Sequence, residues 1–235
     1  MKKVIFITIF LMILGSGTYV FFHSDYFHIE TIEIFGEDKL SEFEILKYAG
    51  VKRKMNLLLL DTNEVKKNLE KHPMIYSATI DKIYPNRLSI SYNLREPIFS
   101  IYYSNCFISI DKELYALSVD QNEKGLMTVY GLDIENFNLG QKIKAYDESL
   151  VEALVLLVKL VKISDLNFIP SIHVENGDIF LIIYKDFIIN FGNGDNIENR
   201  FNAFYNIYID LNESDVSQGI IDVSTDGLPI YKPFD

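Results

Sequence analysis

One uninterrupted apolar segment near the amino end constrains this chain more than any other feature. The segment from Val4 to Phe22 carries no charged side chain over its 19 positions. As an α-helix with a rise of 1.5 Å per residue, it would be roughly 28 Å long, close to the thickness of the hydrocarbon core of a bilayer. The sequence therefore predicts a transmembrane helix over residues 4–22, preceded by a stub of residues 1–3.

The charges that flank this segment predict its orientation. Lys2 and Lys3 precede it and Asp25 follows it, so the positive-inside rule places the amino end in the cytoplasm and the rest of the chain outside. A cleaved signal peptide is the alternative, with small residues at 15–17 near the cut. The apolar run continues to Phe22 and no A-x-A-like site is present, which favours the uncleaved anchor.

Charge and cysteine content exclude several classes of function for residues 23–235. Without Lys2 and Lys3, this part contains 20 basic and 33 acidic side chains, which gives it a net charge of −13. Such a balance argues against nucleic acid and against an anionic membrane surface as the main partner. The single cysteine, Cys106, excludes an internal disulfide framework and a cysteine-rich metal site.

The first part outside the anchor shows a short, regular pattern. A strand is expected where Ile32 and Ile34 alternate with Glu33, and two helices where Ser41–Glu44 and Asp61–Glu64 form capping boxes. Two strands follow these two helices, at 75–83 and 87–95. Residues 27–95 therefore predict a β-α-α-β-β unit with its helices on one face of a small sheet.

Leu150–Ile163 is the other strongly apolar stretch of the chain. It is too short and too charged to span a membrane, and it predicts a buried helix.

Strands dominate the remainder of the chain, interrupted by two helices. A helix is expected at 148–163, and a second at 196–211 with Asp195 and Glu198 as its capping box. The predicted strands cover 98–103, 106–111, 113–118, 126–130, 171–176, 178–184, 186–191, 220–224 and 228–231.

No constellation of catalytic or metal-binding residues stands out. The four histidines are scattered, and Gly192–Gly194 is only half of a dinucleotide-binding fingerprint. Ser109 and Lys112 match S-x-x-K but lack its companion motifs, and Cys106 is expected to be a half-buried strand residue. We therefore predict no catalytic residue, no cofactor and no metal ligand, and a protein that is not an enzyme.

The order of these parts resembles the FtsQ/DivIB family of bacterial cell-division proteins. In that family the first unit outside the membrane is a POTRA domain. The matching motifs are Phe27–Gly36 for the first strand, Asn56–Asp61, His72–Ile80, Tyr84–Ile90, Arg95–Ile98, Ile110–Leu114, Gly219–Val223 and Tyr231–Pro233.

The resemblance implies an α+β fold. It would have one N-terminal transmembrane helix, a β-α-α-β-β POTRA domain, and a mostly antiparallel β domain with two helices. The expected boundaries are a cytoplasmic stub at 1–3, the transmembrane helix at 4–22, the POTRA domain at 23–95 and an FtsQ/DivIB-type β domain at 96–235.

The resemblance also implies a function and a site. Members of this family are scaffolds of the division complex at the septum that bind FtsB/DivIC-like and FtsL-like proteins and support septal peptidoglycan synthesis, with the synthases as further partners. The last strands receive FtsB by strand addition, a mode that uses the unpaired backbone of a sheet edge. Carried over, the partner-binding residues are Ile220, Ile221, Asp222, Val223, Ser224, Leu228, Ile230 and Tyr231.

Two other functions remain open on the sequence alone. The first is a secreted enzyme or binding protein released by signal-peptide cleavage. The second is a POTRA-type chaperone of an export system, although such modules usually occur in series before a barrel, and here there is one unit without a barrel pattern.

Overall fold

The computed structural model describes residues 2–22, 24–164, 166, 170–183, 187–225 and 227–234. It divides into two compact units, Met1–Arg95 and Glu96–Asp235. The predicted strands at 178–184 and 186–191 reach positions 184 and 186, which lie outside the described residues.

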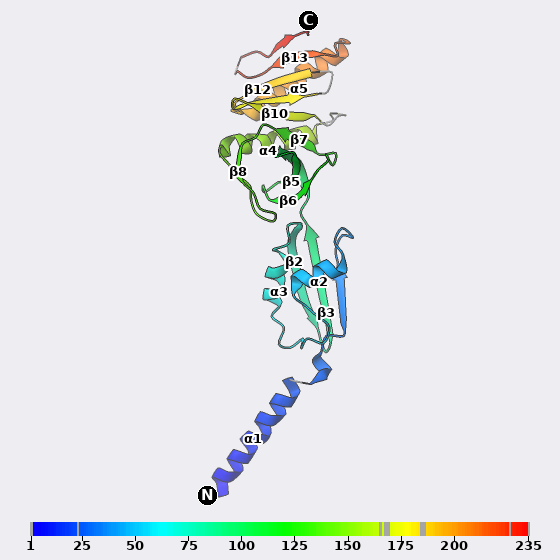
Figure 1. The fold of residues 1–235 in the computed structure, drawn as a ribbon, viewed down its shortest axis with the longest axis vertical. Helices are drawn as coiled ribbons and strands as arrows, with labels where there is room; N and C mark the ends of the chain where they lie inside the picture. Colours follow the sequence, from blue (N-terminus) through cyan, green and yellow to red (C-terminus); the bar gives the residue numbers. More distant parts are fainter. Residues whose placement is uncertain are drawn as a thin grey trace. The chain divides into compact units, whose positions relative to one another are not determined.

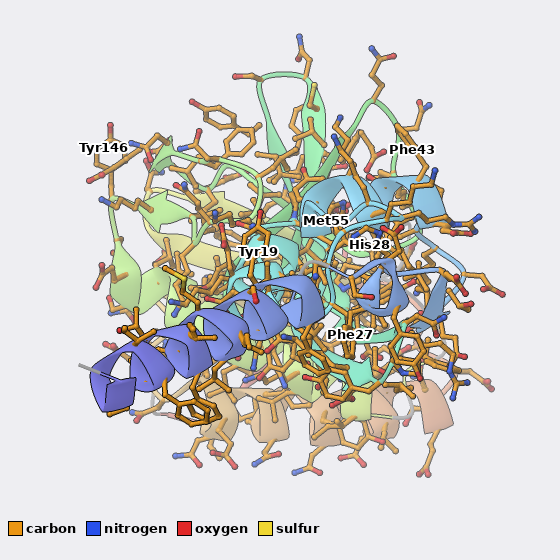
Figure 2. The ribbon with its side chains drawn as sticks, turned by 90° about the horizontal axis from the view of Figure 1, so that it is seen from below. Tyr19, Phe27, His28, Phe43, Met55 and Tyr146 are labelled. Carbon is orange, nitrogen blue, oxygen red and sulfur yellow. The ribbon has the colours of Figure 1, made fainter. Side chains whose placement is uncertain are left out.

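The amino-terminal segment forms α1 (Lys2–Phe22), as its apolar run predicts. Every described side chain from Ile5 to Tyr19 is exposed, and Figure 2 shows them projecting outward around the helix. Over the described ranges, no helix has the combination of length and apolarity that a membrane span requires. The structure thus confirms the helix, and its insertion in a membrane stays a prediction.

The rest of the first unit is the predicted β-α-α-β-β arrangement. Its elements are a 3₁₀ turn at Asp25–Phe27, β1 (Thr31–Phe35), α2 (Glu42–Ala49), α3 (Thr62–Leu69), β2 (Ile75–Ile83) and β3 (Arg87–Leu94). The sheet order is β1-β3-β2, with β1 parallel and β2 antiparallel to β3. Leu88 and Ile90 of the central strand are buried against Ile45, Val65 and Leu69 of the helices.

The connection after α1 is tied to this unit by backbone hydrogen bonds. The N–H of Ile29 donates to the carbonyl of Met55 at 2.9 Å, and the N–H of Leu57 donates to the carbonyl of Phe27 at 2.8 Å. Phe27, His28 and Met55 are labelled in Figure 2. The segment that leads out of α1 is therefore part of the folded unit.

The first predicted capping box forms only by half. Ser41 Oγ accepts from the N–H of Glu44 at 3.2 Å, and Gly50 ends α2 in the left-handed conformation. The carboxylate of Glu44 accepts instead from Nε2 of the buried His72 at 3.1 Å, while His72 Nδ1 accepts from the N–H of Met74. The Glu44 side chain thus connects α2 to the turn before β2.

The second unit is a nine-stranded sheet covered on one face by two helices (Figure 1). Its order is β14-β13-β12-β11-β10-β7-β4-β5-β6, with five antiparallel and three parallel pairings. The helices are α4 (Glu148–Ile163) and α5 (Ile197–Glu213), which contact each other and share one core with alternate strand residues. The strands are β4 (Pro97–Tyr103), β5 (Cys106–Asp111), β6 (Ala116–Asp120), β7 (Met127–Tyr130), β10 (Ser171–Glu175), β11 (Asp178–Ile182), β12 (Phe187–Gly192), β13 (Gly219–Asp222) and β14 (Ile230–Lys232). The mixed α+β fold and the mostly antiparallel sheet agree with the sequence.

Besides shifts of one or two residues at strand ends, two strand segments of this unit differ from the sequence prediction. The strand expected at 113–118 begins only at Ala116, because Asp111 Oδ1 accepts from the N–H groups of Glu113 and Tyr115 and holds 111–115 in a turn. A small hairpin of β8 (Ile134–Asn136) and β9 (Lys144–Ala145) was not expected.

The capping box predicted for α5 is wrong. The cap is Asn196, which has left-handed backbone angles and makes no capping hydrogen bond through its side chain. Asp195 is engaged elsewhere, because its Oδ2 accepts from Nδ2 of Asn193 at 2.7 Å. The boundary of α5 is therefore Asn196, and the predicted box of Asp195 and Glu198 does not mark it.

Candidate partner-binding edge

β14 is the last strand of the large sheet and pairs only with β13 among the described strands. The register sets Ile220 opposite Lys232, Ile221 opposite Tyr231 and Asp222 opposite Ile230. In Figure 1 the carboxyl end lies beyond β13, at the end of this sheet remote from β5 and β6. One long side of β14 consequently presents backbone N–H and C=O groups that another chain can pair with.

The structure brings the eight sequence-predicted residues together in this one hairpin. They occupy β13, the loop after it and β14. Their environments differ. Ile221 and Val223 are buried in the core, Ile220, Asp222, Ser224 and Tyr231 are half-buried, and Leu228 and Ile230 are exposed.

The exposed members are the ones that can contact a partner directly. Leu228 is 89% exposed and Ile230 is 54% exposed. Phe234, which the motif comparison did not single out, follows β14 and is 39% exposed. Ile221 is fully buried, so a substitution there would test stability rather than binding.

Short hydrogen bonds hold the hairpin in place. Tyr231 Oη donates to the carbonyl of Gln218 at 2.9 Å. Asp222 Oδ1 accepts from both the N–H and the hydroxyl of Ser224, at 3.0 and 2.7 Å, and turns the chain after β13. A Cβ on Gly219 would lie 2.7 Å from the carbonyl oxygen of Lys232, so the two strands approach closely because this residue is glycine.

Residues with catalytic potential do not assemble into a site in the described parts of the chain. Ser109 is buried within β5, while Lys112 follows in the turn. Histidine, cysteine, aspartate and glutamate side chains form no group of three or more that could hold a metal ion over the ranges that the structure covers.

One titratable cluster lies on the strands in the middle of the sheet. Tyr130 and His173 stack with ring centroids 4.8 Å apart. Burial, together with a 2.6 Å hydrogen bond to the Glu123 carboxylate, raises the pKa of Tyr130 to about 12. Burial also lowers the pKa of His173, against the weaker opposing effect of Glu175. The rings are held by each other and by local polar groups, which is a structural arrangement rather than a catalytic one.

Comparison with known proteins identifies the first unit as a POTRA domain. Residues 27–91 match the family model of the POTRA domain, FtsQ-type, which covers β1, α2, α3, β2 and most of β3. The part of the first unit from β1 into β3 is thus similar to a POTRA domain of the FtsQ type.

The relatives extend the match over most of the chain. It is 25% identical to the cell division protein DivIB of Clostridium tetani over 89% of this chain and 80% of that protein. It is 28% identical to DivIB of Clostridium botulinum, over 88% of this chain and 82% of that protein. The cell division protein FtsQ of Rickettsia typhi is 28% identical over 56% of this chain and 50% of that protein. The chain is a homologue of the DivIB and FtsQ cell-division proteins, which confirms the resemblance drawn from the motifs.

Proposed function

We propose that this protein is a membrane-anchored scaffold of the bacterial division complex. Its homologues are named as cell-division proteins rather than for a catalysed reaction, which favours a non-enzymatic role. The proposed layout is a cytoplasmic stub at 1–3, an anchor at 4–22, a POTRA domain at 23–95 and a β domain at 96–235. The uncharged run of α1 and the exposure of its described side chains support the anchor.

The proposed partners are FtsB/DivIC-like and FtsL-like division proteins, bound outside the cytoplasm at the septum. The observation that carries this proposal is the free side of β14, flanked by the exposed apolar residues Leu228 and Ile230. A strand from the partner would pair with the β14 backbone and cover these side chains. Through these contacts the scaffold would support septum formation and septal peptidoglycan synthesis.

The test uses the purified full chain and a purified DivIC-like partner. A double variant, Leu228→Ser with Ile230→Thr, removes the exposed apolar surface and leaves the buried Ile221 in place. Fully burying such a side chain contributes about 1.5–3 kcal/mol, and both are more than half exposed, so we expect about 100-fold weaker binding.

Ile163→Thr is the matched control, because Ile163 is the last residue of α4 and is 79% exposed. It should bind like the unmodified chain. Equal affinity of the double variant and the control for the partner would contradict the proposal that β14 is the partner-binding edge.

The cellular role has its own test. A fluorescently tagged full chain should form a band at the septum of dividing cells. Uniform membrane staining would contradict the role in division, and a mature protein that begins near residue 17 would contradict the anchor.

A further inference from the structure

Three segments meet at one end of the first unit, the end that the chain enters from α1. They are the exit segment (residues 24–30), the basic loop (residues 51–60) and the turn after β2 (residues 84–86). β1 is parallel and β2 is antiparallel to β3, so β1 and β3 begin at this end and β2 ends there. Together the three segments form one end surface of the unit.

Backbone hydrogen bonds hold the three segments together. The N–H of Lys54 donates to the carbonyl of Ile29 at 2.9 Å and joins the basic loop to the exit segment. The N–H of Glu30 donates to the carbonyl of Asn86 at 2.9 Å and joins the exit segment to the turn. The end surface is therefore fixed within the folded unit. Figure 2 labels three of its residues, Phe27, His28 and Met55.

The basic loop carries three consecutive cations and no acidic side chain. Lys52, Arg53 and Lys54 are all exposed. None of the three side chains forms an ion pair or a hydrogen bond with a described residue. Their charges are therefore available to an external anion.

Two acidic side chains lie on the exit segment, and each has a local partner. Asp25 Oδ1 lies 3.0 Å from Nδ1 of His28, and Glu30 Oε2 accepts from Nδ2 of Asn86 at 2.7 Å. With these two acids and the three cations of the basic loop, the end surface has a formal charge of +1, whereas residues 23–235 carry −13. The end surface is thus locally cationic in an acidic chain.

Exposed aromatic and apolar side chains accompany these cations. Tyr26 is 66% exposed, Tyr84 is 56% exposed and Leu59 is 63% exposed. The side chain of Asn56 accepts from the N–H of Leu59 at 3.3 Å, and Asn56 forms a β-bridge with His28 of the exit segment. Tyrosine is enriched at the headgroup level of membranes, and lysine and arginine can bury their stems there while the charge reaches the phosphates. The composition of the end surface therefore fits a lipid headgroup region.

The connection to α1 limits how far this surface can lie from a membrane. This step rests on the anchor of the proposed function. Tyr26 follows Phe22 by four residues, which span at most about 14 Å when fully extended. The headgroup region adds roughly 5–7 Å to each side of the hydrocarbon core. The short connection therefore holds the end surface within reach of the lipid phosphates.

We infer that the end surface docks on an anionic lipid bilayer. The cations of the basic loop pair with lipid phosphates, and Tyr26, Leu59 and Tyr84 enter the headgroup region. The net charge of −13 disfavours contact of the remaining surface with the same lipids. Docking consequently selects this end of the first unit and sets its orientation on the membrane.

The test measures lipid contact at two positions of the full chain reconstituted in vesicles. The vesicles are phosphatidylcholine, alone or with about 30% phosphatidylglycerol, and contain a nitroxide lipid that quenches fluorescence near the headgroups. In a Cys106→Ser background, one cysteine at Leu59 or at Tyr76 carries the fluorophore. Tyr76 is 47% exposed at the other end of β2. We expect stronger quenching at position 59 than at position 76, and more of it with phosphatidylglycerol.

A charge variant tests the basic loop itself. A basic side chain near an anionic surface favours binding by about fivefold, so replacing all three by glutamine should lower the ratio of docked to free molecules about 100-fold. Quenching at position 59 should then fall to the level at position 76. The matched control makes the same charge change at three exposed lysines in and after α3: Lys66→Gln, Lys67→Gln and Lys71→Gln.

Three results would overturn the docking: equal quenching at positions 59 and 76, equal quenching at position 59 with and without phosphatidylglycerol, or equal quenching in the two glutamine variants. Alkaline extraction of the unmodified chain separates this failure from failure of the anchor. A chain released from the vesicles overturns the anchor and the docking that rests on it. A retained chain that gives any of the three results overturns the docking alone.

Discussion

Gly219→Ala should detach β14 from the sheet without unfolding the unit. Gly219 is the first residue of β13 and has a φ of +151°. A Cβ there would meet the ring of Tyr231 and would lie 2.7 Å from the carbonyl oxygen of Lys232. Because that oxygen belongs to the backbone of β14, the strand itself would have to move.

The magnitude follows from what holds β14 in place. Three residues of β14 pair with β13, and one side-chain hydrogen bond joins Tyr231 to Gln218. Each hydrogen bond contributes about 1 kcal/mol net, and the docking of such a short edge strand is further reduced by the entropy of ordering it. A backbone conformation that alanine disfavours costs about 1–3 kcal/mol before the contact with Lys232 is counted. The substitution is therefore comparable to the whole free energy that docks β14.

Amide hydrogen exchange measures this local opening directly. In Gly219→Ala those amides of β14 that donate to β13 should exchange about 10–100-fold faster, since 1.4 kcal/mol corresponds to a factor of ten, while β11 keeps its protection. Gly227→Ala is the matched control. Gly227 lies in the same hairpin, and its added Cβ would contact only Thr225 Oγ1, at 3.5 Å. Equal protection of β14 in the two variants would refute the argument.

Three further changes test other parts of the structure. Ser41→Ala should destabilise the first unit by about 1 kcal/mol, because it removes the cap of α2; urea denaturation followed by circular dichroism measures this. Leu154→Ala should cost the second unit about 2–5 kcal/mol in the same assay, because Leu154 is fully buried in the core. Burial lowers the pKa of His173 below its ordinary 6.5, so the folded state disfavours its protonation and stability should fall as pH drops below about 6.5. His173→Gln should show a smaller loss between pH 7.5 and 5, and an equal loss would contradict this origin.

Much of the fold follows from local patterns that the sequence displays. The helix at 148–163 is predicted at the bounds that the structure has, because a long apolar stretch needs no distant partner to be recognised. The alternation of Leu88, Ile90, Tyr92 and Leu94 likewise predicts the buried face of β3. Such signals are contained within one element.

The differences arise where a side chain has competing partners. Glu44 and Asp195 both fit capping boxes in sequence, but Glu44 bonds to His72 and Asp195 to Asn193. Asp111 delays β6 through a turn that periodicity does not reveal. These outcomes depend on tertiary neighbours or on local turns, which a linear pattern does not specify.

In the candidate site, too, the sequence predicts the elements but not the environment of each side chain. Motif order predicts the hairpin of β13 and β14, yet it does not separate the buried Ile221 from the exposed Leu228 and Ile230.

Site-specific photo-crosslinking in dividing cells tests the central claim most directly. A photoreactive residue is placed at Ile230 on β14, and separately at Val119 on β6, which is 41% exposed on the opposite edge strand of the same sheet. We predict a crosslink from position 230, and none from position 119, to an FtsB/DivIC-like protein. A crosslink from position 119 alone, or equal crosslinks from both, would contradict partner binding at β14.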